Sequence, residues 1–371
     1  MQMIVRFMVP VVFYAAYKMV NNPSIKYLSI SCFGLIFQFY CVIYTGFYLL
    51  YFSALFILIY YLFSKKWKDL LYYFKKEKIG YAAALFLGSF LSLLWLLFPY
   101  LTMSKTVGLR LYRETITYLP LWNSFLFPHE ASVTWRFLFN MARPDVPKWW
   151  LHYLFAGIIP FTAMIVSPFY LLYNRYKKIK TPLLLKSIII TSVIIALLHL
   201  RTESGLTLYA FIFKLPGINS MRVLTRFMHV EIFLLLLIFG YFLVRINSKY
   251  ILVIFLLVFA DNFFAPGYIP REEKAGLIKR KEILLTELEK HDYKNTRAIA
   301  LVDTTQQAFV THLDMMIVAQ AAGINTVNGY SSYCPDDFGE FFNNVSEEGL
   351  YQWMESRKVN KEDILVINRE Y

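Results

Sequence analysis

Long apolar runs alternate with short basic or polar segments over the first 264 residues of the chain. A helix that crosses a bilayer needs about 20 mostly apolar residues. Eight runs reach or approach this length, namely Met3–Val20, Tyr27–Ile43, Phe47–Phe63, Gly80–Leu101, His152–Tyr173, Leu183–Leu200, Arg226–Val244 and Tyr250–Phe264. Because residues 27–63 are too long for one span, we expect a tight helical hairpin broken at Tyr44-Thr45-Gly46. The pattern predicts a polytopic, all-α membrane bundle of about eight transmembrane helices.

The pattern changes after residue 264, where short strand-like and helix-like segments replace the long runs. Helices are predicted at Arg271–Lys290, Thr311–Ala321 and Ser346–Lys358, with Ser346 as the N-cap of the last. Strands are predicted at Ala298–Val302, Asn325–Asn328 and Ile364–Ile367. This alternation predicts a small α/β domain over residues 265–371, separate from the transmembrane domain at residues 1–264.

Composition agrees with this division. Hydrophobic residues make up 58% of the chain and charged residues 17%, against about 45–50% and about 25% in soluble domains. The net charge of +13 is unevenly spread: residues 1–264 carry 26 Lys+Arg and 8 Asp+Glu, whereas residues 265–371 carry 12 and 17. The basic excess therefore belongs to the apolar part of the chain. No basic stripe lies on a soluble module, so no nucleic-acid partner is expected.

The basic residues also predict an orientation. They gather in four loops that alternate in phase, around residues 18–26, 65–78, 175–180 and 245–249, and such loops are typically cytoplasmic. The N-terminus and the α/β domain then lie outside the cytoplasm. The α/β domain holds only Cys334 and so forms no internal disulfide, which favours a bacterial inner (plasma) membrane. Because the chain begins directly in a span, we expect a further membrane segment, upstream or in a partner.

Ionisable residues within spans are costly and are candidates for function. Arg222, Arg226 and His229 have the spacing i, i+4, i+7, which would place them on one face near the outer end of the seventh helix. Arginine binds phosphate oxygens through two parallel hydrogen bonds, so this face could hold an anion. Arg6 and Arg201 are predicted at the same level. The alternative is that these arginines reach toward lipid headgroups without a dedicated site, and Glu231 is expected to pair with a neighbouring span.

The acid and base candidates are less specific. Asp261 could serve as an acid/base group or as a helix-end cap, and Glu114, His129 and Glu130 lie in the long loop of residues 102–151. In the tail, the predicted substrate-binding residues are His312 and Asp314 on a helix start, and Asn328, Tyr330 and Ser331 on a turn that could contact carbohydrate. The alternative for the first two is a self-capped helix start with Thr311. No metal-binding or cofactor motif is present, so neither is expected.

Several local patterns resemble one family. They are Leu215-Pro216-Gly217 followed by Met221-Arg222-Val223 and Arg226-Phe227, the tail segments His312–Met315 and Gly323–Ser331, the start Arg6-Phe7 with Pro10, and the hairpin Tyr44–Tyr48. Together they resemble GT-C-like bacterial polytopic membrane glycosyltransferases. The resemblance covers most of the chain through local patterns, without a catalytic signature.

The resemblance implies transfer of a sugar from a polyprenyl-phosphate carrier to an acceptor outside the cytoplasm. Arg222, Arg226 and His229 would hold the lipid phosphate, and Asp261, Glu114 or an acid on a further segment would act as base. The family's acidic residue in the first outer loop has no counterpart here, so this chain resembles a C-terminal portion. A non-catalytic scaffold or lipid-linked-glycan binding subunit of an envelope-assembly complex is the alternative. A transporter is disfavoured, because the polar groups gather at the outer ends rather than at mid-membrane.

Overall fold

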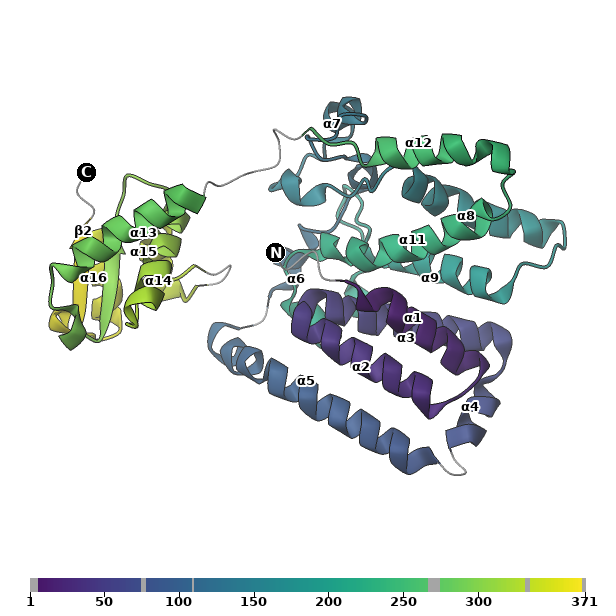
Figure 1. Cartoon of the computed structure of the whole chain (residues 1–371), viewed down its shortest axis with the longest axis horizontal. Coiled ribbons are helices and arrows are strands. Elements are labelled where there is room, and N and C mark those ends of the chain that lie inside the picture. Colours follow the sequence, from purple (N-terminus) through teal and green to yellow (C-terminus); the bar gives the residue numbers. More distant parts are fainter. Residues whose placement is uncertain (1–5, 75–77, 109, 266–273, 331–333, 369–371) are drawn as a thin grey trace. The chain divides into compact units, whose positions relative to one another are not determined.

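The computed structural model describes residues 6–74, 78–108, 110–265, 274–330 and 334–368. The chain divides into two compact units, Met1–Ile269 and Pro270–Tyr371, which we call unit 1 and unit 2 (Figure 1). Unit 1 consists of helices joined by loops. Unit 2 combines helices with a pair of strands.

The helices of unit 1 follow the apolar runs of the sequence. They are α1 (Met8–Asn21), α2 (Ile25–Cys41), α3 (Ile43–Ser64), α4 (Trp67–Tyr73), α5 (Ile79–Val107), α6 (Tyr112–Ile116), α7 (Arg136–Ala142), α8 (Ile158–Tyr176), α9 (Leu183–His199), α10 (Ala210–Phe213), α11 (Met228–Leu243) and α12 (Ile251–Asp261). Short 3-10 helices at η2 (Trp122–Leu126), η3 (Trp149–His152), η4 (Ile218–Ser220), η5 (Leu224–Phe227) and η6 (Ser248–Tyr250) lie in the connections.

Three helical segments in the described residues are long and apolar enough to cross a membrane, namely Ile43–Ser64, Ile79–Lys105 and Leu224–Leu243. They correspond to the third, fourth and seventh predicted spans. The other predicted spans form shorter or less apolar helices, α1, α2, α8, α9 and α12, of 14, 17, 19, 17 and 11 residues. The helical class of the prediction is confirmed and is compatible with a membrane protein, while the number of eight spans stays a prediction.

The helical hairpin breaks earlier than the sequence suggested. Val42 adopts an extended backbone conformation, and α3 begins at the next residue. Gly46, expected in the turn, lies instead in the first turn of α3, where the Phe39 ring comes within 2.5 Å of the position that a Cβ would occupy. A larger side chain would collide with this ring. The glycine therefore serves close packing of α2 on α3, and the prediction of a break at residues 44–46 is wrong.

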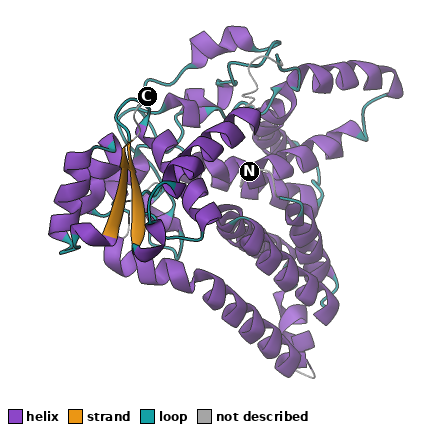
Figure 2. Ribbon diagram, turned by 60° about the vertical axis from the view of Figure 1, so that its left-hand side comes forward, coloured by secondary structure: helices purple, strands orange, loops and turns teal. Residues whose placement is uncertain are grey.

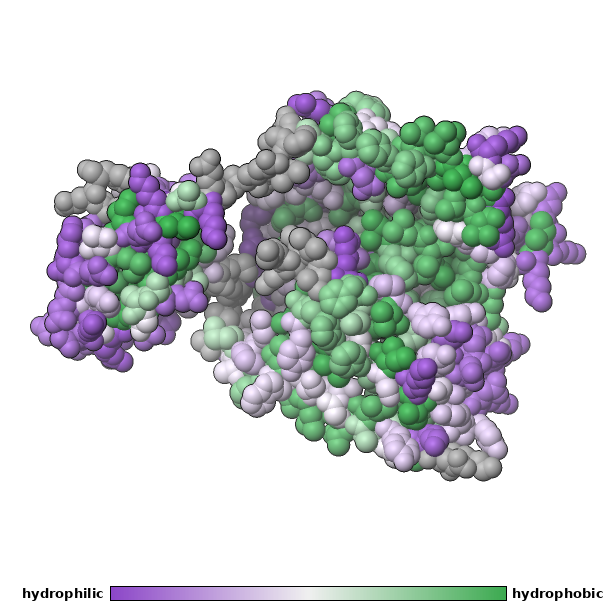
Figure 3. All heavy atoms as spheres, viewed as in Figure 1, coloured by the Kyte–Doolittle hydropathy of each residue, from purple (hydrophilic) through white to green (hydrophobic). Residues whose placement is uncertain are grey.

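The core of unit 1 lies where α3, α9 and α11 pack against one another. Tyr48, Ile189 and Leu235 come from these three helices and are fully buried. Helix α5 contrasts with them, because only 6% of its most apolar stretch is buried and Trp95 is 81% exposed. Hydrophobic side chains cover much of the visible face of unit 1 (Figure 3). Such a large exposed apolar surface is unfavourable in water and suits a lipid environment.

Unit 2 is a small layered α/β domain. Its elements are α13 (Lys274–Glu289), β1 (Ala298–Val302), α14 (Ala308–Ala322), α15 (Gly339–Asn344), α16 (Glu347–Ser356) and β2 (Ile364–Asn368), with 3-10 turns between them. The two strands are parallel and pair Ala298 with Ile364 (Figure 2). Side chains alternate across β1, so Ile299 and Leu301 face α13 and α14, whereas Ala300 faces α15 and α16.

Most elements of unit 2 match their predicted positions, and the Ser346 hydroxyl accepts a hydrogen bond from the Gly349 N–H as the expected N-cap. The strand predicted at Asn325–Asn328 is reduced to one bridge between Thr326 and Ile299. Beyond that bridge the Asn328 amide replaces the backbone, because it accepts from the Leu301 N–H at 2.6 Å and donates to the Leu301 carbonyl at 3.0 Å. A side chain thus completes the edge of the sheet.

Candidate anion-binding site

A cavity of about 320 Å³ lies in unit 1 beside the N-terminal end of α11. Its walls come from residue 6, residues 150–156 and residues 223–232. Three of the sequence-predicted binding residues line it together: Arg6, Arg226 and His229. We call this the arginine cavity. The fold unites side chains up to 223 positions apart, which the sequence pattern could only suggest.

The segment that carries these residues is not one continuous helix. Gly217 adopts a φ of +79°, and the Phe47 ring comes within 2.1 Å of the position that a Cβ would take. Only glycine fits this turn. The chain then forms the 3-10 turn η5 and enters α11 only at Met228. The expectation that Arg222, Arg226 and His229 share one helical face is therefore wrong for Arg222, which precedes both helices.

The side chains of the arginine cavity contact an aromatic ring and one another. The Arg226 guanidinium carbon lies 4.6 Å from the centre of the Tyr44 ring, which favours the cation electrostatically. Arg6 Nη1 lies 3.4 Å from His229 Nδ1. Within the described part of the chain, the buried Arg226 Nε has no hydrogen-bond partner. An unsatisfied buried donor is unfavourable, and an anionic oxygen in the cavity would satisfy it.

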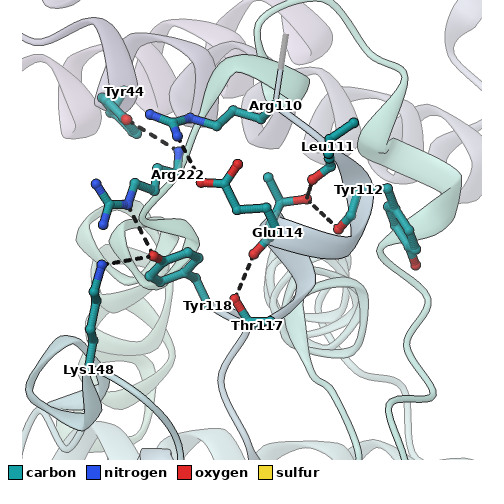
Figure 4. Close-up of polar contacts among 10 residues, drawn as sticks. Tyr44, Arg110, Leu111, Tyr112, Glu114, Thr117, Tyr118, Lys148 and Arg222 are labelled. Carbon is teal, nitrogen blue, oxygen red and sulfur yellow. Dashed lines mark hydrogen bonds and ion pairs between the residues drawn. The ribbon is translucent and has the colours of Figure 1, made fainter. Parts of the chain in front are cut away.

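A second cationic group lies next to Tyr44. The Tyr118 hydroxyl oxygen accepts from Arg222 Nε at 3.2 Å and from Lys148 Nζ at 3.3 Å (Figure 4). Arg222 also donates its backbone N–H to the Tyr44 hydroxyl at 3.3 Å. Burial by itself raises the pKa of Tyr118, but the hydrogen bonds and charges of Arg222 and Lys148 outweigh it and lower that pKa. This arrangement, the Tyr118 cluster, favours negative charge on oxygen.

The cations of this region form no ion pairs among the described residues. Among the described residues, Arg6, Arg222, Arg226 and Lys148 take part in none of the ion pairs. The lining of the arginine cavity contains no Asp or Glu. Like charges gathered at a half-buried site repel one another, and an anion relieves that repulsion. The region is therefore built to receive an anion rather than a cation.

The two predicted catalytic carboxylates have other partners. Glu114 forms an ion pair with Arg110 at 2.8 Å. Asp261 accepts from the Ile158 N–H at 2.8 Å, the Ile159 N–H at 3.2 Å and Trp135 Nε1 at 3.0 Å. Asp261 thus has the helix-end role that the sequence left as one of two alternatives. It is the last residue of α12 and caps the N-terminal end of α8.

Gly157 makes the approach of Asp261 to α8 feasible. It precedes α8 with a φ of +108°, and a Cβ there would lie 2.4 Å from the Asp261 carboxyl carbon. A side chain at this position would push the carboxylate away from the helix N-terminus. Helix α12, the last helix of unit 1, ends at Asp261 itself.

The remaining candidates of unit 1 lie apart from the arginine cavity lining. Arg201 donates its backbone N–H to the Pro120 carbonyl, and its Nε has no partner among the described residues. Glu231 bonds to Ser192 of α9, which confirms the expected pairing with a neighbouring span. His129 accepts from the Ala131 N–H at 3.0 Å, as a loop residue would.

In unit 2, the predicted substrate-binding residues are mostly buried. His312 and Asn328 are 0% and 2% exposed, and Asp314 is 6% exposed and pairs with Arg280 at 3.1 Å. Helix α14 begins at Ala308, so the proposed cap by Thr311 and Asp314 is wrong. Of the predicted carbohydrate-contacting turn, Asn328 is therefore buried, and so are His312 and Asp314 of α14. Tyr330 is 51% exposed, and Ser331 lies outside the described residues.

Sequence reasoning missed the partners that complete the region. Tyr44 was expected only as a turn residue, and Lys148 was not singled out. Tyr118 was not singled out as a site residue either. The signal for Tyr118 and Lys148 is weak, because the loop of residues 102–151 gives neither residue a distinguishing spacing.

Comparison of the chain with protein-family models, with curated proteins and with solved structures found no match. The resemblance to GT-C-like glycosyltransferases therefore rests on the sequence patterns alone.

Proposed function

We propose that unit 1 binds a polyprenyl-phosphate-linked sugar by its phosphate in the arginine cavity, and that the protein serves transfer of this sugar to an acceptor outside the cytoplasm. The observation that carries the proposal is the buried, unpartnered Arg226 Nε in a cavity shared with Arg6 and His229. A phosphate oxygen supplies the acceptor that this donor lacks. The Tyr118 cluster adjoins the site through Tyr44 and adds positive potential.

The proposal includes a membrane topology. Eight spans would place the arginine cavity and unit 2 outside the cytoplasm of a bacterial inner membrane, with the basic loops inside. The three long apolar helices and the exposed apolar surface of α5 support membrane insertion. A polyprenyl chain would then lie in the lipid beside unit 1, with its phosphate at the level of Arg226.

In a transfer reaction the arginines would stabilise the charge that develops on the departing lipid phosphate. The acceptor hydroxyl also needs a base. Glu114 is paired with Arg110 and Asp261 caps α8, so neither carboxylate is free toward the cavity. This observation favours a second candidate function, a lipid-linked-glycan binding subunit that presents its ligand to a catalytic partner.

Binding is tested with Arg226→Ala in the full chain, reconstituted in nanodiscs of uncharged-headgroup lipid and titrated with polyprenyl phosphate. A hydrogen bond to a charged group contributes about 1.5–3 kcal/mol, so affinity should fall roughly 10- to 100-fold. Arg226→Lys should recover part of it, because lysine lacks the planar fork. Arg245→Ala is the matched control, since the exposed Arg245 contacts the carbonyl and the ring of Tyr241 and does not line the arginine cavity. Equal affinity in Arg226→Ala and wild type would refute the phosphate site.

The two candidate functions differ in what the purified chain does alone. A glycosyltransferase releases polyprenyl phosphate from a radiolabelled lipid-linked sugar when acceptor is added. A binding subunit holds the lipid-linked sugar with wild-type affinity and turns it over only after membranes containing its partner are supplied. Turnover by the pure chain excludes the second role.

A further inference from the structure

A second cavity in unit 1 is lined by lysines rather than arginines. Its volume is about 580 Å³, and it lies between the C-terminal end of α3 and the N-terminal end of α9. Its polar lining comes from Ser64, Lys66, Lys180, Thr181 and Lys186. We call it the lysine cavity. It shares no lining residue with the arginine cavity.

The lysine cavity concentrates positive charge that no acid neutralises. Its lining contains no Asp or Glu, and its three lysines belong to none of the ion pairs among the described residues. Lys186 is held in place, because its Nζ lies 3.7 Å from the centre of the Phe63 ring. Three ammonium groups around one cavity attract an anionic ligand.

Neutral groups in the lining complete the chemistry of an anion site. Thr181 accepts from Asn174 Nδ2 at 3.0 Å, which leaves its own hydroxyl proton to donate. Helix α9 starts after Pro182 without a side-chain cap, so its first N–H groups keep their partial positive charge. Ammonium, hydroxyl and backbone N–H donors together match the oxygens of a phosphate group.

The position of the lysine cavity indicates where the phosphate comes from. Helix α8 runs from the arginine cavity region at one end to the loop of Lys180 at the other, and its 19 residues span about 28 Å. That is close to the hydrocarbon thickness of a bilayer, about 30 Å. Leu62 and Ile179, which neighbour lining residues in the chain, are 66% and 52% exposed and offer an apolar surface for acyl chains.

We propose that the lysine cavity binds the phosphate headgroup of an anionic phospholipid, at the end of the helices opposite the arginine cavity. Such a site anchors the α3–α9 pair in the leaflet that carries the basic loops. It is independent of the sugar carrier and of the role proposed for Arg226.

The test uses the full chain in phosphatidylcholine nanodiscs with increasing phosphatidylglycerol, and native mass spectrometry to count bound anionic lipid. Replacing Lys66, Lys180 and Lys186 by Gln should weaken binding by at least about 10-fold, since each lysine near an anionic lipid surface contributes about 1 kcal/mol. The matched control replaces Lys68, Lys177 and Lys178 by Gln. It removes equal charge from nearby positions outside the cavity lining, and it should weaken binding clearly less than the cavity variant does, because these lysines contribute only through general attraction to the lipid surface.

The outcomes separate the site from general charge attraction. Equal losses in the two triple variants would overturn the proposal, and so would displacement of the lipid by millimolar inorganic phosphate, which would make the ligand a free anion. If the triple variant inserts poorly, Lys180→Gln and Lys186→Gln are measured singly, and each should lose roughly 5-fold in affinity. No loss in either would refute the site. Arg226→Ala should leave this binding unchanged, which keeps the test distinct from that of the arginine cavity.

Discussion

The arginine cavity of unit 1 was predicted from the sequence in the same way as a group of buried polar side chains in unit 2, but the two differ in their hydrogen bonding. We call this group, which consists of His312, Asp314 and Asn328, the unit 2 cluster. Both were predicted to bind ligand, and both gather polar side chains from separate segments. In the arginine cavity, Arg226 Nε lacks a partner among the described residues. In the unit 2 cluster, Asn328 bonds to both backbone groups of Leu301, and His312 bonds to Asn328 and to the Phe342 carbonyl.

This difference separates a site from a scaffold. Polar groups whose hydrogen bonds are all made internally have no capacity left for a ligand, and their loss costs stability. Polar groups that remain unsatisfied beside a cavity can still form a hydrogen bond with a ligand. We therefore expect substitutions in the unit 2 cluster to affect folding of unit 2 and substitutions in the arginine cavity to affect ligand binding. Neither set should have much effect on the other property.

The largest effect is expected for Asn328→Ala. The change removes both hydrogen bonds to Leu301 and leaves a buried N–H and C=O without partners, so unit 2 should lose about 2–4 kcal/mol of unfolding free energy. Hydrogen exchange of the β1 peptide in the full chain measures this loss. Binding of polyprenyl phosphate should stay within error of wild type. Intact protection together with weaker binding would reverse the comparison and make Asn328 a ligand residue.

A smaller loss is expected in unit 1 for Asp261→Ala. Losing a helix cap costs about 0.5–2 kcal/mol, which should lower the thermal unfolding midpoint in detergent. Asp261→Asn retains a carbonyl acceptor and should recover much of that loss. The asparagine variant also separates the two roles that the sequence left open for this residue. If Asp261 were the base of a transfer reaction, Asp261→Asn would abolish turnover while the protein remained stable.

The sequence predicted those features that depend on local patterns. Apolar runs located the helices, and the alternation in the tail located β1, β2, α14 and the Ser346 cap, because period and capping chemistry are local properties. The same holds for Arg226 and His229, whose spacing of three was sufficient to place both in the arginine cavity.

The rest depended on tertiary contacts. Gly217 packs against Phe47 ahead of η5 and α11, and the third strand is replaced by the Asn328 side chain; neither follows from propensity. The contact of Asp261, at the end of α12, with the start of α8 is likewise tertiary. Partners such as Lys148 reach the region from a long loop, whose path is set by packing rather than by periodicity.

The pH dependence of unit 2 sharpens the comparison further. Burial lowers the pKa of His312, and its Nδ1 faces the Asn328 amide nitrogen at 3.4 Å, so the neutral ring is the one that fits. In the unfolded chain the ring takes up a proton near pH 6.5, before the folded form does. Stability is therefore complete above that pH and falls as the pH drops below it.

Hydrogen exchange of the α14 peptide, corrected for intrinsic rates, should thus show weaker protection at about pH 5 than at about pH 7.5. His312→Gln cannot titrate and should lose this part of the pH dependence. A pH response that persists unchanged in His312→Gln would assign it to other groups.

The smallest effect is expected for Tyr118→Phe. This change tests, within unit 1, whether donors that already have partners in the protein are lost to the ligand. Arg222 and Lys148 are cations like Arg226, but both already donate to the Tyr118 hydroxyl oxygen. Removing that oxygen frees two donors next to the arginine cavity while the ring can still pack. Affinity for polyprenyl phosphate should then rise by roughly 2- to 5-fold, the scale of one ordinary net hydrogen bond of about 0.5–1 kcal/mol. The rise should shrink at high salt, because it comes from charges near the surface. A tenfold loss of affinity would instead mean that the Tyr118 hydroxyl itself contacts the ligand. In that case side chains that are already hydrogen-bonded to one another, as in the Tyr118 cluster, can also be part of a binding site.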